Sequence, residues 1–293
     1  MKVPDFLKKG DRIGLFAPAR KLNREEAEKA MAILKSWGLI PVLGKNIFGD
    51  EHQFSGTDEE RAEDLHLFLE DPSIKAVIAF RGGYGCVRIL PYLADHYAQA
   101  KWIIGYSDIT VLHTWANQKL GWASLHATMP VNMIQEGPQR IESNESLRKA
   151  LFGEPETLFV EGNHPPKEAL LCGGNLSVIY SLLGSDLQLN SKGKFLFLED
   201  LDEYLYHVDR MMQAIVRSGI GSKAAAWLIG GMSDMRDNAI PFGADPREII
   251  SNSHKGLVSP LAFGLEAGHQ ALNRAMIFGI PYRLEGSTLT PRL

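Results

Sequence analysis

The sequence has only two cysteines in 293 residues, Cys86 and Cys172, and no CxxC pair. A disulfide framework and a zinc site of paired cysteines are therefore not indicated, and an HExxH motif is also absent. We expect two buried free thiols in a reducing compartment. We also expect no metal and no other cofactor.

Long hydrophobic runs and an excess of one charge are missing too. No apolar stretch approaches the length that spans a bilayer. The opening MKVPDFLKKGDRIGLF is charged and interrupted by Pro4, unlike a secretory signal. The formal net charge is −4 with both signs interspersed, which gives no case for a nucleic-acid or anionic-membrane partner. A cytoplasmic protein is expected.

The composition that remains is that of a globular protein, with 45% hydrophobic and 23% charged residues. In the first half, apolar β-favouring runs alternate with segments of helical periodicity. This alternation predicts an N-terminal α/β domain over residues 1–153, with a parallel, Rossmann-like sheet between helices. The predicted strands are 12–17, 40–43, 76–80 and 102–104, and the predicted helices are 24–37, 58–69, one from residue 87, and 109–120. The 58–69 helix is expected to expose its Glu and Arg side chains.

The second half is less regular. Residues 154–168 are rich in proline, glycine and charge, which predicts a crossing linker. Residues 169–293 are predicted to form a smaller C-terminal domain of α+β or barrel-like type. Its predicted elements are helices at 175–183 and 203–218, a strand at 194–198, an apolar stretch at 224–229, and short strands near 261–263 and 275–277.

The stretch KWIIGYSDITVLH contains a candidate nucleophile. Ser107 follows a predicted buried strand and precedes a predicted helix, so it lies on a strand-to-helix turn beside backbone N–H groups that favour negative charge. Serine and aspartate are also preferred helix N-caps. The local pattern fits both a nucleophile and an ordinary cap.

A serine nucleophile needs a base and an orienting acceptor for that base. His269 stands between glycines in FGLEAGHQ, which suits a base but also an ordinary surface turn. Glu199 closes the strand KFLFLED, where a charge requires a partner. Asp200 and Glu266 are rival orienters, and position alone does not separate the three carboxylates.

The mechanism also needs backbone donors for an oxyanion. The glycine-rich RGGYG after the third predicted strand offers such N–H groups, and the N–H of Asp108 is a second candidate. A phosphate loop is the rival interpretation of RGGYG. It is weak, because the third glycine of the dinucleotide pattern is missing and no GxxxxGK[ST] occurs.

Seven segments in order along the chain resemble one family. They are FAPAR, FSGTDEERAEDL, AVIAFRGGYG, IIGYSDITVLH, LCGGNLSVI, FLFLEDLDEYLYHVDRMM and FGLEAGHQALN. Together they resemble the LD-carboxypeptidases, the serine peptidase family S66 that includes muramoyltetrapeptide carboxypeptidase.

The resemblance implies a triad of Ser107, Glu199 and His269, with the oxyanion held by the N–H groups of Gly83 and Asp108. It places the serine in an N-terminal α/β domain and the other two residues in a C-terminal domain. It also implies a cytoplasmic homodimer that cleaves the bond before the terminal D-alanine of murein tetrapeptides without a metal, during peptidoglycan recycling.

Two positions depart from the family pattern. The first strand ends in APAR where many relatives carry a small residue, and the late motif is GLEAGH, so Arg20 and Glu266 are expected to reshape the mouth of the site. Arg81 and Tyr84 are candidate substrate-binding residues. Arg81 is a candidate for the substrate's carboxylate, and a structural salt bridge is the favoured alternative for it.

Three other functions stay open. A hydrolase resembling the microcin C immunity protein would cleave acyl-sulfamoyl or acyl-phosphate adenylates, but such relatives tend to be longer, with an added aromatic loop. A small-molecule binding module would use RGGYG and the Ser107 turn without turnover. An α/β-hydrolase fits less well, because residue 109 is isoleucine where GxSxG requires glycine.

Overall fold

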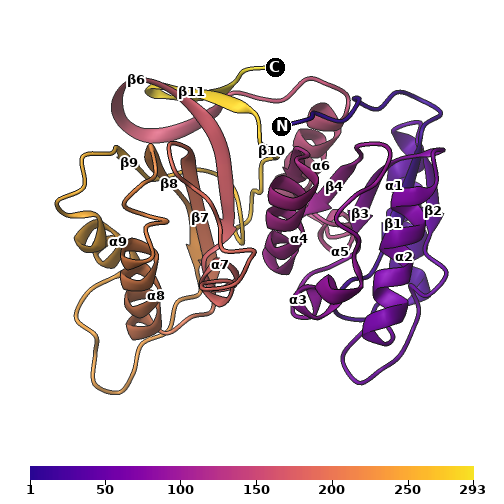
Figure 1. Cartoon of the computed structure of the whole chain (residues 1–293), viewed down its shortest axis with the longest axis horizontal. Coiled ribbons are helices and arrows are strands. Elements are labelled where there is room, and N and C mark those ends of the chain that lie inside the picture. Colours follow the sequence, from indigo (N-terminus) through magenta and orange to yellow (C-terminus); the bar gives the residue numbers. More distant parts are fainter. The chain divides into compact units, whose positions relative to one another are not determined.

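A computed structural model describes all residues from 1 to 293. The chain forms two compact units, each described by itself below. Unit 1 contains Met1–Glu156 and Arg274–Gly279, and unit 2 contains Thr157–Asn273 and Ile280–Leu293. Figure 1 colours the chain from indigo in unit 1 through magenta and orange to yellow at the C-terminus.

Unit 1 is built on a six-stranded sheet with the order β10-β5-β4-β3-β1-β2. Its strands are β1 (Arg12–Phe16), β2 (Ile40–Leu43), β3 (Ile74–Ala79), β4 (Trp102–Gly105), β5 (Ser124–His126) and β10 (Met276–Phe278). All neighbours pair in parallel except β10, which is antiparallel to β5. The four predicted strands and the parallel sheet are confirmed.

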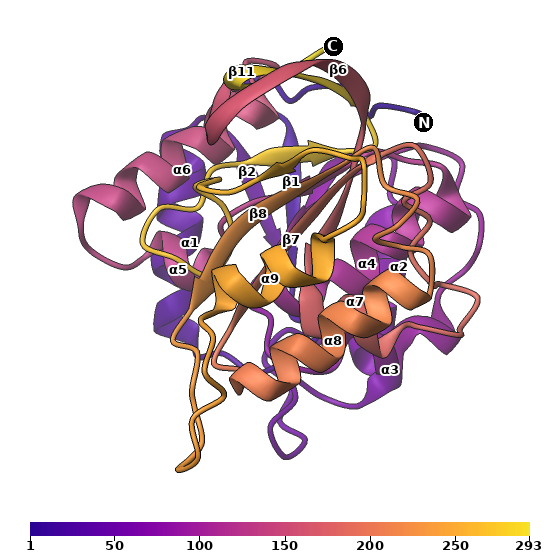
Figure 2. The same cartoon turned by 90° about the vertical axis from the view of Figure 1, so that its left-hand side faces the viewer.

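Helices cover both faces of this sheet. They are α1 (Arg24–Ser36), α2 (Asp58–Glu70), α3 (Cys86–Ile89), α4 (Thr110–Trp115), α5 (Pro130–Met133) and α6 (Pro138–Leu151), with short helices η1 (Leu90–Tyr92), η2 (Ser107–Ile109) and η3 (Ala116–Leu120). The helices α1, α5 and α6 form one contacting group and α2, α3 and α4 another, and Figure 2 shows the groups on opposite sides of the sheet. Capping boxes start both α1 and α2.

The strand predicted near 275–277 was expected in the C-terminal domain, but it lies in unit 1. It is β10, and it completes the sheet of unit 1 by pairing Met276 with His126 and Phe278 with Ser124. The predicted C-terminal domain 169–293 is therefore interrupted by residues 274–279. No local pattern signals this return, because the pairing joins residues about 150 positions apart.

Unit 2 contains a five-stranded sheet with the order β11-β6-β7-β8-β9. The strands are β6 (Leu158–Asn175), β7 (Phe195–Leu201), β8 (Ala226–Ser233), β9 (Leu261–Ala262) and β11 (Pro281–Pro291). Residues 158–168 thus belong to a long strand paired with β11, and the prediction of a linker over 154–168 is wrong there. The N–H of Glu161 in β6 also donates to the carbonyl of Phe263, just after β9, at 2.8 Å, which links these two strands of the sheet.

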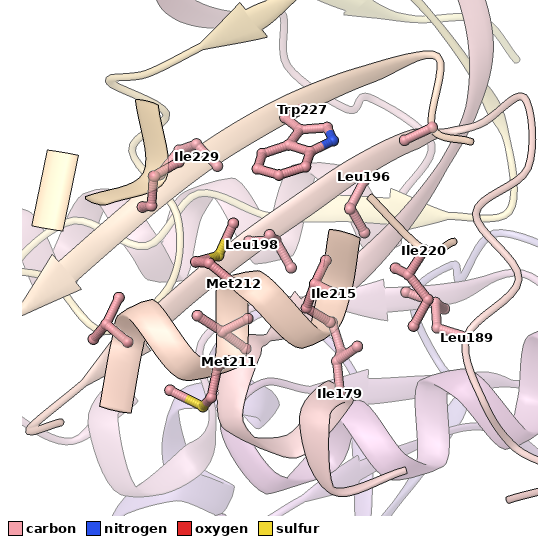
Figure 3. Packing of buried hydrophobic residues seen from close by; sticks show 14 of the residues in the cluster. Ile179, Leu189, Leu196, Leu198, Met211, Met212, Ile215, Ile220, Trp227 and Ile229 are labelled. Carbon is pink, nitrogen blue, oxygen red and sulfur yellow. The ribbon is translucent and has the colours of Figure 1, made fainter. Parts of the chain in front are cut away.

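Three helices cover one face of this sheet. They are α7 (Leu176–Ser181), α8 (Leu205–Arg217) and α9 (Pro246–His254), and Figure 2 shows α8 and α9 in front of β7 and β8. Figure 3 shows side chains of α8, among them Met212 and Ile215, packed toward Leu196, Leu198 and Trp227 of the strands, and all of these are fully buried. This core fixes β7, the strand that carries Glu199 and Asp200 close to its end.

The remaining expectations concern the cysteines and the membrane. Both Cys86 and Cys172 are buried and free, as predicted. No helix combines the length and the apolar character that crossing a bilayer requires.

Candidate active site

Ser107 lies directly after β4 in a backbone conformation that serine rarely adopts. Its φ is +65°, in the left-handed region, and the residue is half-buried. The short helix η2 begins at Ser107 without any side-chain capping bond, and so does α4 after it. The N-cap interpretation is therefore wrong. A strained conformation of this kind costs about 1–3 kcal/mol and is typical of active sites.

Two residues of unit 1, Gly105 and His113, fix the backbone of this turn. Gly105 has a φ of +153°, and a Cβ there would lie 2.7 Å from the side chain of Ile109, so only glycine fits. The ring Nε2 of buried His113 donates to the Gly105 carbonyl at 2.9 Å. Burial lowers the pKa of His113 to about 4, so the ring is neutral at physiological pH.

The RGGYG loop lies against the Ser107 turn. A Cβ on Gly82 would lie 3.1 Å from Cβ of Ser107 and 3.3 Å from the backbone nitrogen of Asp108. The Asp108 carboxylate accepts a hydrogen bond from the N–H of Cys86 at 2.9 Å, which ties the far end of the loop to the same turn. The predicted oxyanion donors, Gly83 and Asp108, therefore belong to two loops that unit 1 brings together.

The prediction that the arginine of the 58–69 helix is exposed is wrong. Arg61 is only 1% exposed, and its guanidinium donates to the carbonyls of Gly85 (3.1 Å), Gly56 (3.4 Å) and Pro18, while it pairs with Asp58. Three loops at the carboxyl edge of the sheet thus share one cation. The helical periodicity placed Arg61 among charged residues and gave no sign of this role.

In unit 2, Glu199 and His269 form a buried pair. Oε2 of Glu199 accepts from Nδ1 of His269 at 2.7 Å and from its backbone N–H at 2.9 Å, and the Glu199 side chain is fully buried. Because the carboxylate accepts, Nδ1 carries the proton, and Nε2 has the lone pair when the ring is neutral. This is the tautomer that a general base for serine requires.

Gly268 makes the pair sterically possible. Its φ is +99°, and a Cβ there would lie 2.5 Å from Oε2 of Glu199. The N–H of Gly268 donates to Oδ1 of Asn273 at 2.9 Å, which fixes the loop that carries His269. The glycine before His269 is therefore required by the carboxylate, not only by the turn.

The rival orienters are placed differently. Glu266 is exposed, and Asp200 points to another set of partners, the side-chain amide of Asn175 and the N–H of Ser177, at 2.9 and 2.8 Å. A shift of strand register between β7 and β8 at this point accompanies the burial of both Glu199 and Asp200. The geometry selects Glu199 as the partner of His269.

Charge in this region shifts two pKa values. Burial opposes the protonated form of His269, but the nearby carboxylates, first Glu199 and then Asp200, outweigh it and raise the pKa of His269 above its usual 6.5. Burial, helped by the negative charge of Glu199, raises the pKa of Asp200 to about 6. The imidazolium of His269 is therefore stabilised in unit 2.

The two candidate substrate-binding residues, Arg81 and Tyr84, have few contacts with other side chains. Nη1 of Arg81 donates to the backbone carbonyl of Lys21 at 3.3 Å and pairs with no carboxylate, so the salt-bridge alternative is wrong. Tyr84 is 47% exposed, with its ring centroid 6.0 Å from that of Phe54. No group of three or more His, Cys, Asp or Glu side chains is placed to hold a metal ion.

Comparison with known proteins identifies the family. Residues 13–127 match the LD-carboxypeptidase N-terminal domain, and residues 168–284 match the LD-carboxypeptidase C-terminal domain. A murein tetrapeptide carboxypeptidase of Pseudomonas aeruginosa is 30% identical over 292 residues, which covers 95% of this chain and 94% of the relative. The chain belongs to the LD-carboxypeptidase family. It is a serine-type carboxypeptidase, as the resemblance predicted.

Solved structures agree on the fold. A muramoyltetrapeptide carboxypeptidase from Oxalobacter formigenes is 26% identical with a TM-score of 0.86, covering 95% of this chain and 97% of that chain. The microcin C7 self immunity protein MccF in its wild-type apo state is 20% identical with a TM-score of 0.88, covering 100% and 99%. The second likeness concerns the fold alone. The predicted α/β class with two domains is confirmed.

Proposed function

We propose that this enzyme removes the terminal D-alanine from murein tetrapeptides through a triad of Ser107, His269 and Glu199. The observation that carries the proposal is the 2.7 Å bond between His269 and the buried Glu199, because a serine hydroxyl reacts only with a correctly oriented base. The left-handed turn of Ser107 and the adjoining glycine loop support the same role.

The proposed reaction has two halves. Oγ of Ser107 attacks the carbonyl between the L-centre of the diamino acid and D-alanine, while Nε2 of His269 takes the serine proton. The N–H groups of Gly83 and Asp108 donate to the oxyanion. His269 then gives its proton to the leaving amine, which breaks the bond and releases D-alanine. Water, deprotonated by His269, hydrolyses the acyl-enzyme and restores Ser107.

Glu199 has an electrostatic part in this cycle. It holds Nδ1 protonated in the resting enzyme and stabilises the imidazolium that forms during each attack. The raised pKa of His269 expresses the same stabilisation. No step requires a metal ion.

The substrate assignment draws on the relatives. Both the Pseudomonas protein and the Oxalobacter protein carry names that refer to murein or muramoyl tetrapeptides. Because the chain shares its fold with MccF, the assay below also includes an adenylate as a substrate. The cytoplasmic location, the role in peptidoglycan recycling and the homodimer that the family implies stay predictions.

One assay tests the reaction. Purified protein is incubated with murein tetrapeptide, with and without a chelator, and D-alanine is followed by mass spectrometry. We expect chelator-insensitive release that Ser107→Ala abolishes and that the exposed control Ser36→Ala leaves unchanged. Full release by Ser107→Ala would contradict the mechanism. Cleavage of an aminoacyl sulfamoyl adenosine without release of D-alanine would change the substrate class.

A further inference from the structure

Arg20 is an exposed cation at the carboxyl edge of the unit 1 sheet. Its side chain forms no ion pair and no hydrogen bond. Three other exposed arginines, Arg88, Arg236 and Arg247, are each paired with a carboxylate. Arg20 therefore has its full donor set available to a molecule from solution.

The loop that carries Arg20 is held on both sides. The N–H of Ser55 donates to the carbonyl of Ala19 at 3.1 Å, and the N–H of Lys21 donates to the carbonyl of Gln53 at 3.1 Å. These bonds flank Arg20 in an irregular segment after β1. The backbone of Arg20 is therefore fixed before any ligand arrives, which lowers the entropy lost on binding.

The side chain of Arg20 extends over the predicted oxyanion loop. A Cβ on Gly83 would lie 2.7 Å from Nε of Arg20 and 2.8 Å from its Cδ. Gly82, the preceding residue, is the one that lies against Ser107. Burial raises the pKa of Asp108, and the positive charges of Arg61 and Arg20 act in the opposite direction. Arg20 thus stands beside the nucleophile turn within the same unit.

The chemistry of a carboxypeptidase substrate fits this position. Its terminal carboxylate lies one residue beyond the scissile carbonyl, a reach of at most about 3.6 Å along the chain. A guanidinium binds a carboxylate with two parallel hydrogen bonds. The neighbouring arginines are less suited, because Arg61 is buried and Arg88 is held by Asp58.

We propose that Arg20 binds the terminal carboxylate of the substrate and so selects peptides with a free C-terminus. The proposal rests on the carboxypeptidase function proposed above. Arg81, the candidate from the sequence, has one N–H group directed to the Lys21 carbonyl, whereas Arg20 has none engaged. The residue that departs from the family pattern in FAPAR is then a specificity determinant of this chain.

The test compares two substrates, the tetrapeptide with a free terminal carboxylate and the same peptide as its terminal amide. The wild type should cleave the acid with the higher kcat/KM. Arg20→Gln should lower kcat/KM for the acid about 10- to 100-fold, the range of a hydrogen bond to a charged group, and change it for the amide less than about 3-fold. Arg20→Lys should lie between, because lysine keeps the charge without the two-pronged geometry.

Two variants serve as controls. Arg24→Gln removes the same charge four residues away, where the guanidinium stacks over Phe48, and should leave both substrates unchanged. Arg81→Gln should affect both substrates equally. If Arg81→Gln abolishes the preference for the acid and Arg20→Gln does not, the proposal is wrong.

Measuring peptide affinity tests the role of Arg20 independently of the reaction. The affinity of both peptides is measured by calorimetry on Ser107→Ala, with and without Arg20→Gln. A preference for the acid that disappears with Arg20→Gln supports the binding role even if the wild type releases no D-alanine, a result that would overturn only the reaction. Equal affinity for acid and amide on Ser107→Ala overturns the role of Arg20.

Discussion

The Ser107 turn in unit 1 and the Glu199–His269 pair in unit 2 are held by different physical means. Around Ser107, backbone geometry dominates: a left-handed φ of +65° and glycines packed closely against the turn. Around Glu199, a fully buried charge is compensated by one imidazole. The first region is sensitive to the backbone and the second to electrostatics.

This difference has an energetic consequence. The left-handed backbone of a residue with a Cβ, such as Ser107, costs about 1–2 kcal/mol of conformational strain. Replacing the side chain by hydrogen, as in glycine, removes this strain. A buried carboxylate such as Glu199 that loses its partner costs about 3–5 kcal/mol, because the charge stays desolvated. Substitutions in unit 1 should therefore change activity more than stability, whereas those in unit 2 should change both.

The largest effect should come from Glu199, the carboxylate proposed to orient the base. Glu199→Gln keeps the shape but removes the charge, and we expect kcat to fall about 10³- to 10⁴-fold. Glu266→Gln is the matched control on an exposed carboxylate three residues from His269, and kcat should change less than about 3-fold. Steady-state kinetics with tetrapeptide measure both. Equal losses in the two variants would contradict the assignment of Glu199.

A steric change in unit 2 should have the next largest effect. Gly268→Ala brings a Cβ to 2.5 Å from Glu199, in a backbone with φ of +99°. We expect kcat to fall about 100-fold through misplacement of His269, with a loss of unfolding free energy. Gly243→Ala has a similar φ of +86° and nothing within 4 Å, so it isolates the backbone cost of about 1–2 kcal/mol. Chemical denaturation should show the larger loss for Gly268→Ala.

The pH dependence of kcat/KM should reflect the interaction between Glu199 and His269. The proposed base His269 can accept a proton only when neutral, so kcat/KM should fall as the pH drops through a pKa above 6.5. Glu199→Gln removes the charge that raises this pKa, and the acid limb should move to lower pH. A pH–rate profile of both proteins measures the shift. An unchanged limb would mean that Glu199 does not stabilise the imidazolium.

The smallest expected effect is a difference in stability between two variants of Ser107, which measures backbone strain apart from catalysis. Ser107→Gly and Ser107→Ala both remove the hydroxyl, but only glycine accepts a φ of +65° without cost. We expect Ser107→Gly to be more stable than Ser107→Ala by about 1 kcal/mol in chemical denaturation. Equal stabilities would show that the turn is not strained.

Much of unit 1 was predictable because its signals are local. Apolar strands of four to six residues end at, or within three residues of, a glycine or proline, and helices begin at capping residues such as Asn23 and Thr57. Unit 2 was harder, since β6 is exposed along much of its length and is rich in proline and glycine. β6 pairs with β11, more than a hundred residues later, and no local signal in β6 points to that partner.

The site was predictable in residue type but not in geometry. Spacing offered three carboxylates for His269, and only the folded chain shows that Glu199 meets Nδ1. The sequence also left open whether Ser107 caps a helix, because caps and nucleophile turns share the same residue types. The hidden role of Arg61 depends on three loops that no local pattern brings together.

The central proposal is that His269 activates Ser107. A fluorophosphonate probe, which phosphonylates activated serines, tests it most directly when the rate of labelling is followed by intact mass and the modified residue is mapped by peptide sequencing. We expect Ser107 to be labelled and the rate to fall at least about 10³-fold in His269→Ala, with no comparable fall in Glu266→Gln. Labelling of Ser107 at the wild-type rate in His269→Ala would contradict the account.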